Sequence, residues 1–553
     1  MGMDESYQDK RGLRRTNLSM IMGYTEGDLR TKPHIAIINT WNEGNVAHID
    51  LRHLAEFVRA GIWASGGVPF EYNVYGECLD NTPSLGCLSG VSGHDVPWHG
   101  AVTRDVLAAS IENITQMSQN GVVFMGGCDK SGPGLLLGAA RCNFPSIIVP
   151  AGPSLEGRYE DFESPLCEFH GFQCTIGTCG SFGSGNSIQI LSEGLGMTLP
   201  RASTVPTVVT KRKWIANESG KQILQLAQKN IRPKDIMTKE ALENAIVLMN
   251  ALGLSVNCVW HLLALVRELD LDDAITIDTF DRISREVPVL TNVFPVGSLG
   301  GYGGKGERGF TITDFDEAGG VPAVMKLLGE KYLHLDVMTV TGKTLRENLE
   351  DARVRRSDVI HPPTDPVLPQ SLVVMRGNLC TSGICRISVT PPEMMQFKGP
   401  AVVFDSIPEY WEGISKGKVK RGDVLVVRYV GPRGGPGMPH VMREMEDRSG
   451  VGRENVFMIT DGTVSGGSGY GPVIAQTTPE AAVGGPIAAV RDGDIIEVDV
   501  QGRKLNVRLT EEEIQRRLSG WKRPPLKTKR TSICRAWELH ALPASQGAGL
   551  ELP

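Results

Sequence analysis

The stretch GVVFMGGCDKSGPG, residues 121–134, decides the fold that this sequence predicts. Its first half is a short apolar run of the kind that forms a buried strand. Its second half is a glycine- and proline-rich turn that leads into small residues. A strand followed by a turn and a helix is the repeating unit of parallel sheets. Residues 128–130 are therefore expected at the strand end, where such sheets bind ligands.

The same alternation continues on both sides of this stretch. Three more apolar runs predict buried strands: HIAIINT (34–40), VPFEYNV (68–74) and PSIIVPAGP (145–153). Helical spacing separates them, and residues 239–268 predict a long helical stretch with a break at Gly253. We expect an α/β domain over residues 33–365, with helices covering both faces of a parallel sheet. Residues 1–32 are polar and are expected to form an arm or a poorly ordered lead-in.

The character of the chain changes at HPPTDPVLPQ (361–370), where the prolines predict a linker. Short β-type runs separated by turns follow this segment, among them SLVVMRG, PAVVFDS, DVLVVRYVG, VFMITDG, DIIEVDV and KLNVRLT. Such a series predicts a smaller β-rich, barrel-like domain over residues 366–553.

The composition excludes several classes of protein. The 553 residues carry a formal net charge of −6, which gives no basic footprint for nucleic acid. No run of 18 apolar residues predicts a membrane span. The N-terminus lacks the apolar core of a signal peptide, so a cytoplasmic protein is expected. Eleven cysteines in such a chain favour thiols, metal ligands or redox groups over disulfides.

The residues at 128–130 combine three kinds of ligand. The Cys128 thiolate suits iron–sulfur or zinc, and the Asp129 carboxylate suits magnesium, with the amine of Lys130 next in the chain. One strand end could thus serve two adjacent metal centres. From spacing alone, the alternative stays open that this is a turn with an incidental cysteine and a surface Asp-Lys pair.

A second cysteine, Cys179, opens the glycine- and serine-rich turn GTCGSFGSGNS (177–187) before a predicted helix. The positive end of a helix favours a thiolate or a bound anion. The alternative is an ordinary capped helix with a buried thiol.

Two glycine-rich loops, VGPRGGPGMPH (430–440) and ITDGTVSGGSGYGP (459–472), lie in the predicted second domain. They suggest a surface that folds over a small anionic ligand, with the hydroxyl of Ser465 exposed beside glycines. The stretch lacks the G-x-S-x-G motif, so a hydrolase is not favoured. The alternative is that these glycines only form turns.

Together these stretches resemble the dihydroxy-acid and phosphogluconate dehydratase family, which includes the arabinonate- and xylonate-type sugar-acid dehydratases. The resemblance runs from about residue 33 to 545, through blocks that include INTWNE, GGCDKSGPG, LGLSVNCVWHLLAL, VRYVGPRGGPGMP and TDGTVSGG. The Gly76-Glu77 pair, the Gly-Tyr-Gly that follows Ser465 and the tail HALPASQGAGLEL are more similar to the sugar-acid branch than to the branched-chain amino-acid branch.

The resemblance implies a hydro-lyase that converts a 2,3-dihydroxy carboxylate to a 2-keto acid. It implies an iron–sulfur cluster, 2Fe-2S rather than 4Fe-4S, beside Mg²⁺ in a homodimer or homotetramer. The positions that match the family's site are the cluster cysteines Cys128 and Cys179, the magnesium ligands Glu77 and Asp129, the carbamylated lysine Lys130 and the base Ser465.

Two positions depart from the family pattern. Ala47 stands where the family has a cluster cysteine, and His440 stands where it has a magnesium-binding glutamate. Alanine cannot ligate iron, and imidazole suits zinc or iron better than magnesium. Cys78, Cys87 or Cys174 could supply the third thiolate. The alternatives are therefore a divergent member with a rebuilt metal site and different chemistry, or a non-catalytic relative.

Overall fold

The computed structural model describes residues 10–76, 100–116, 119–155, 175–293, 310–441, 443, 446, 449–464, 471–525 and 532–551. Its N-terminal part contains a parallel sheet with the strand order β2-β1-β3-β4. The strands are β1 (His34–Asn39), β2 (Val68–Asn73), β3 (Gly121–Gly126) and β4 (Ser146–Pro150). Every pairing between them is parallel, and every residue of the central strand β3 is buried. The predicted parallel sheet is confirmed.

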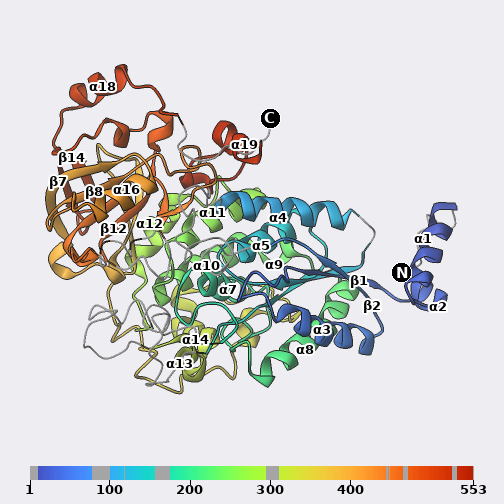
Figure 1. The fold of residues 1–553 in the computed structure, drawn as a ribbon. Coiled ribbons are helices and arrows are strands. Elements are labelled where there is room, and N and C mark those ends of the chain that lie inside the picture. Colours follow the sequence, from blue (N-terminus) through green and yellow to red (C-terminus); the bar gives the residue numbers. More distant parts are fainter. Residues whose placement is uncertain are drawn as a thin grey trace.

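Helices cover the sheet on two sides (Figure 1). One layer holds α3 (Leu51–Ala64) and α8 (Thr210–Lys229), and the other holds α4 (Gly100–Thr115) and α5 (Ser131–Cys142). The remaining helices of this part are α7 (Ser184–Gly194), α9 (Pro233–Ile236), α10 (Lys239–Leu252), α11 (Asn257–Glu268), α12 (Ile277–Glu286), α13 (Ile312–Ala318), α14 (Gly320–Tyr332) and α15 (Leu345–Asn348). The predicted break at Gly253 is confirmed, since that residue ends α10 with a left-handed φ of 64°.

The N-terminal segment is more ordered than its composition suggests. Residues 10–31 contain the helices α1 (Lys10–Ile21) and α2 (Glu26–Thr31), which a poorly ordered lead-in does not describe, while an arm over residues 1–32 stays a prediction. Thr25 caps α2 by accepting a bond from the Asp28 amide, and Tyr24 donates to the carbonyl of Pro69 over 2.8 Å. Local caps and this anchor on β2 stabilise helices that lack a long apolar face. None of the described helices is long and apolar enough to cross a membrane.

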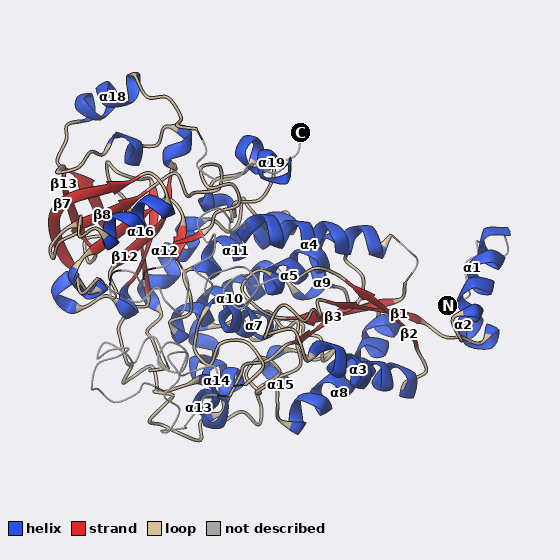
Figure 2. Ribbon diagram, in the orientation of Figure 1, coloured by secondary structure: helices blue, strands red, loops and turns tan. Residues whose placement is uncertain are grey.

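The C-terminal part is an eight-stranded sheet with the order β14-β13-β7-β8-β10-β12-β6-β5 (Figure 2). Its strands are β5 (Leu372–Met375), β6 (Ser382–Arg386), β7 (Gln396–Phe404), β8 (Val424–Val427), β10 (Phe457–Thr460), β12 (Val473–Thr478), β13 (Ile495–Asp499) and β14 (Lys504–Val507). A bridge between Arg376 and Lys504 links the two edges, so the sheet is nearly closed. This confirms the predicted barrel-like region. Its helices are α16 (Ile407–Ser415), α18 (Glu511–Ser519) and α19 (Ser532–His540).

The proline-rich segment between the two parts is docked on the first one. Isolated bridges join Val289 to Leu368 and Thr291 to Ile360, and the amide of His361 donates to the carbonyl of Leu290. A domain boundary at residue 365 therefore stays a prediction. A further two-stranded sheet, β9 (His440–Val441) with β11 (Thr463–Val464), lies outside the barrel sheet.

The crossing of α3 and α8 provides a test of this packing. Gly61 and Gly220 face each other there, and a Cβ atom on Gly61 would overlap the carbonyl oxygen of Asn217. Gly61→Ala gains up to about 1 kcal/mol of helix propensity. The overlap should cost about 1–3 kcal/mol or more, because a backbone atom cannot move aside easily. We expect a lower free energy of unfolding in denaturant titrations.

The matched control is Gly520→Ala, whose added Cβ atom meets open space. It should change stability by less than about 0.5 kcal/mol. Equal stability of the two variants would contradict the close crossing of α3 and α8.

Candidate active site

The turn after β3 lies deep inside the protein. Cys128, Asp129 and Lys130 are 1%, 4% and 3% exposed, so the alternative of a surface Asp-Lys pair is wrong. Glycine is needed at 126 and 127, because an added Cβ atom would come within 2.5 Å of Thr40 Oγ1 or Gln189 Oε1. Cys128 itself has a φ of 155°, which is rare for a residue with a side chain. The strand end is therefore shaped to bury three functional groups.

Asp129, Lys130 and His440 meet at one point, although His440 comes from the other part of the chain. The ammonium of Lys130 contacts Asp129 Oδ2 and lies 2.8 Å from His440 Nε2. His440 Nε2 lies 3.0 Å from the same carboxylate oxygen. Burial alone would raise the pKa of Asp129, but the charges of Lys130 and His440 hold it well below its ordinary value. The centre of this cluster is thus an ionised, buried carboxylate.

A buried amide fixes the strands that carry His440. In the two-stranded sheet, Thr463 pairs with His440. Asn257, at the start of α11, accepts a bond from the Thr463 hydroxyl and donates to the carbonyl of Val464 over 3.0 Å. It also donates to Ser184 Oγ at the start of α7, over 2.8 Å. Asn257 therefore links the β9–β11 pair to two helices of the N-terminal part, α7 and α11.

His261 faces the other oxygen of Asp129. Its Nε2 lies 3.7 Å from Asp129 Oδ1, which is longer than a hydrogen bond. Among the described residues, neither nitrogen of His261 makes a hydrogen bond, and Asp129 Oδ1 accepts none. Burial lowers the pKa of His261 to about 3, so its ring is neutral. The ring stacks on Trp260, whose other contacts include the ammonium of Lys130 at 5.2 Å.

The carboxylate of Asp129 suits a divalent cation by its chemistry, but the described residues do not form a complete site for one. A buried carboxylate oxygen is normally satisfied by a hydrogen-bond donor, a water or an ion, and among the described residues Asp129 Oδ1 has no donor. Asp129 also has Lys130 and His440 at its other oxygen. Among the described residues, no three His, Cys, Asp or Glu side chains form a group that could hold a metal ion. Glu77 lies outside the described residues, so it stays a prediction as a further ligand.

The two expected cluster cysteines lie at the start of α7. An added Cβ atom on Gly185 would lie 3.4 Å from Cys128 Sγ, and one on Gly183 would lie 3.6 Å from Cys179 Sγ. Ala47 packs directly against Cys128, at 3% exposure. The described residues thus supply two cysteine side chains and a methyl group, which does not fit a cluster held by three cysteines. Cys78, Cys87 and Cys174 lie outside the described residues.

Several residues of this region could not be recognised from the sequence. His261, Trp260 and Asn257 belong to an apolar helical block, where a lone polar residue is more often a core residue than a ligand. His48 is fully buried beside Ala47, and its ring nitrogens lie 3.0 Å from the carbonyl of Gly76 and 2.7 Å from that of Gly127. Burial lowers its pKa to about 4. His48 thus joins the ends of two strands behind the cysteines.

The unpartnered nitrogens of His261 lead to a prediction. His261→Phe keeps a ring of similar shape and removes two buried polar atoms, so the metal-free protein should be as stable or up to about 1 kcal/mol more stable. The same change should weaken Mn²⁺ or Mg²⁺ binding by about 10–100-fold, because it removes the group that faces Asp129 Oδ1. Thermal unfolding and titration calorimetry measure the two effects. A destabilised variant with unchanged cation affinity would contradict this role.

Similarity to known proteins shows the family to which the chain belongs. The chain matches the family models for the dihydroxy-acid/6-phosphogluconate dehydratase N-terminal region, over residues 32–171 and 163–348, and C-terminal region, over residues 358–548. A dihydroxy-acid dehydratase from Acetivibrio thermocellus is 39% identical over 98% of this chain and 99% of its own length. The dihydroxy-acid dehydratase from Methanobrevibacter smithii is 37% identical over 93% of this chain and 94% of its own length. The chain therefore belongs to the dihydroxy-acid/6-phosphogluconate dehydratase family.

Proposed function

We propose that this protein is a hydro-lyase that removes water from a 2,3-dihydroxy carboxylate and releases a 2-keto acid. The observation that carries the proposal is the meeting of Asp129, Lys130 and His440 in one buried cluster. Membership of the dehydratase family supports the reaction class. We further propose a cytoplasmic homodimer or homotetramer, as the resemblance implies.

The cation-binding residues of this proposal are Asp129, Glu77 and Lys130, the last in its carbamylated form. A bound Mg²⁺ would supply Lewis acidity for the carboxylate and 2-hydroxyl of the substrate, which makes the C2 proton more acidic. Asp129 is suited to this role because its ionised carboxylate is buried and held in place. The neutral ring of His261 lies beside Oδ1 of Asp129 and limits the rotation of that carboxylate.

Ser465 is the proposed base, although it lies outside the described residues. Its ionised oxygen takes the proton from C2, and the electron pair of that C–H bond forms the C2=C3 double bond. The C3–O bond breaks, and the leaving hydroxide gains a proton to become water. The enol then takes a proton at C3 and becomes the 2-keto acid.

For the substrate we propose a sugar acid ahead of a branched dihydroxy acid. The features that support this choice are the Gly76-Glu77 pair, the Gly-Tyr-Gly after Ser465 and the C-terminal tail. The relatives are named only as dihydroxy-acid dehydratases, which does not separate the two classes.

A second candidate is a rebuilt site that uses zinc or iron. The observation that favours it is His440 Nε2, 3.0 Å from Asp129 Oδ2 at the position of a family glutamate. Imidazole is a better ligand for these metals than for magnesium. His440→Glu separates the candidates, since it should increase magnesium-dependent turnover in the first case and abolish turnover in the second.

The proposed base leads to a direct test. Ser465→Ala cannot accept a proton, so kcat for 2-keto acid formation should fall by about 10²–10⁴-fold, with a smaller change in KM. The assay uses a panel of sugar acids and branched dihydroxy acids. Ser449→Ala is the matched control, because that exposed serine donates to the carbonyl of Glu446 and accepts a bond from the amide of Val451. An active parent with an equally active Ser465→Ala variant would remove Ser465 from the mechanism.

The cysteines lead to a second test. We propose that Cys128 and Cys179 bind iron despite Ala47, because both flank the first turn of α7. Protein purified without air should contain at least about one iron per chain with labile sulfide, and Cys128→Ala should lose both. Cys385→Ala, at a buried thiol of β6 in the barrel, should keep them. Iron below that level in the parent, without visible charge-transfer bands, would overturn the iron proposal.

A further inference from the structure

The loop that delivers His440 is held at its beginning by a buried carboxylate. Asp461 accepts bonds from the amides of Tyr429 and Val430 over 3.1 and 3.0 Å. Two successive amides that converge on one anion form a backbone nest. Tyr429 adopts a left-handed φ of 60°, which turns both amides toward the carboxylate. Asp461 also accepts a bond from the amide of Ala481, so it joins three segments of the chain.

A second buried carboxylate holds the next turn of the same loop. Glu480 accepts bonds from the amides of Arg433 and Gly434, each over 2.8 Å and each at a different oxygen. Glycine is needed at 431, because an added Cβ atom would come within 2.6 Å of Glu480 Oε2. Four amides of residues 429–434 are thus bound by two side chains that belong to other segments. We call Asp461 and Glu480 the carboxylate clamp.

The far end of the loop lies against the first domain. The carbonyl of Gly437 accepts a bond from the amide of Ala101, at the start of α4, over 2.7 Å. An added Cβ atom on Gly100 would come within 2.8 Å of Lys130 Cε and 3.0 Å of the carbonyl of Met438. His440 follows two residues later, beside Asp129 and Lys130. The position of the loop therefore sets the position of His440.

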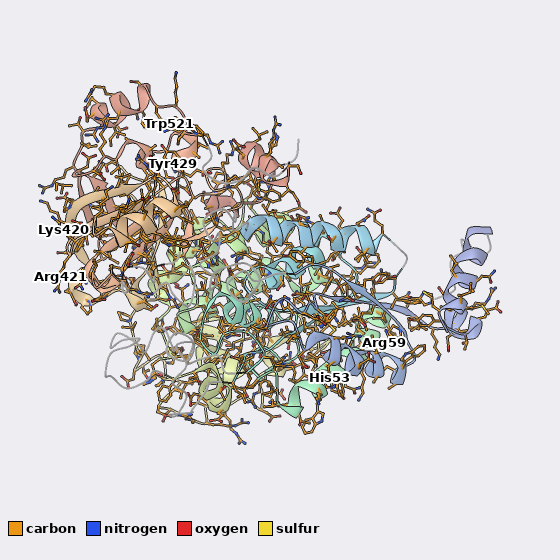
Figure 3. The ribbon with its side chains drawn as sticks, viewed as in Figure 1. His53, Arg59, Lys420, Arg421, Tyr429 and Trp521 are labelled. Atoms are coloured by element: carbon orange, nitrogen blue, oxygen red, sulfur yellow. The ribbon has the colours of Figure 1, made fainter. Side chains whose placement is uncertain are left out.

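The clamp holds two acidic groups, and described arginines act on each of them with the opposite charge. The charge of Asp461 acts on Glu480, and Arg523 acts on it with the opposite sign. Arg428 acts on Asp461, while its guanidinium is bonded to Asp405 and to carbonyls that include those of Ile487 and Val490. Trp521 donates to the hydroxyl of Tyr429 over 2.9 Å, and Figure 3 labels both residues in the C-terminal part of the protein.

We propose that Glu480 is a positioning residue that acts through the His440 loop, and that the protonation state of its carboxyl group controls how firmly the loop is held. The role follows from its two amide bonds and its burial beside Asp461. Glu480 touches neither His440 nor Asp129 in any described contact, so its effect on the site passes through the backbone of residues 429–439.

The direction of the pH dependence follows from the burial of Glu480. Burial and the charge of Asp461 raise the pKa of Glu480 to about 7, from an ordinary value of 4.5. When the loop opens to water, this pKa returns toward the ordinary value, so the closed loop binds the proton more tightly than the open loop. Closure is therefore strongest at low pH and weakens as pH rises through about 7.

Amide hydrogen exchange measures this directly in the full-length protein. After correction for the intrinsic exchange rate, protection of residues 429–434 should fall by about tenfold between about pH 5.5 and 8. Glu480→Gln cannot titrate and should show no such fall. Glu193→Gln is the matched control, since Glu193 is buried and accepts amide bonds from Arg201 and Ser203, away from the loop. It should keep the behaviour of the parent.

A second variant keeps the test decisive if Glu480→Gln does not fold. Asp461→Asn removes the neighbouring negative charge, so the fall in protection should move to lower pH. Constant protection in the parent, or the same fall in Glu480→Gln, would overturn the proposal. So would an unchanged midpoint in Asp461→Asn.

The consequence for catalysis rests on the proposed function. With a dihydroxy acid as substrate, the step near neutral pH in the profile of kcat/KM should be lost in Glu480→Gln and kept in Glu193→Gln. A purely structural Glu480 would lower stability and leave the profile unchanged. A protein that forms no keto acid would refute the proposed function, while the exchange data would still decide the role of Glu480.

Discussion

The burial of one ionised carboxylate, that of Asp129, is the constraint on which the site depends. Removing a charge from water costs several kcal/mol unless close partners compensate. Here the partners come from two directions, with Lys130 next in the chain and His440 from the far part of the chain. The contact therefore couples the parallel sheet to the C-terminal region. A change that displaces either partner leaves the carboxylate with only one of its two compensating groups.

The rest of the structure serves to bring these groups together. Glycines at the end of β3 let the chain turn sharply, so that Cys128 and Asp129 point inward. Asn257 fixes the strands that carry His440, and the carboxylate clamp fixes the loop before them. Buried polar side chains thus carry out the positioning, while the apolar cores of the sheet and barrel provide the frame.

Much of this frame could be predicted from the sequence. Short apolar runs bounded by glycine and proline marked the four parallel strands, and the strand-end position of Asp129 followed from them. The strands β6 and β12 were missed, because β6 starts in a Thr-Ser-Gly turn and β12 follows a glycine-rich loop. The helices within residues 10–31 were not predicted, because a cap and a hydrogen bond to Pro69 stabilise this segment in place of an apolar face.

The site was predictable only where a residue type matched a known pattern. Nothing local distinguishes His261 from a core histidine, since its role depends on an oxygen 132 residues away in the chain. Glu480 and Asp461 lie in ordinary turn sequences, and their function emerges only when amides from residues 429–434 converge on them. Contacts of this kind depend on tertiary structure, which single-sequence patterns do not encode.

The most direct test of the account is 2-keto acid formation by the anaerobically purified parent and by Asp129→Asn. The substitution keeps the shape of the side chain and removes the charge at the centre of the site. The account predicts product from the parent with at least one dihydroxy acid. It predicts that the rate of the folded variant is lower than that of the parent by about 100-fold or more. Equal rates, or no product from the parent with any dihydroxy acid, would contradict it.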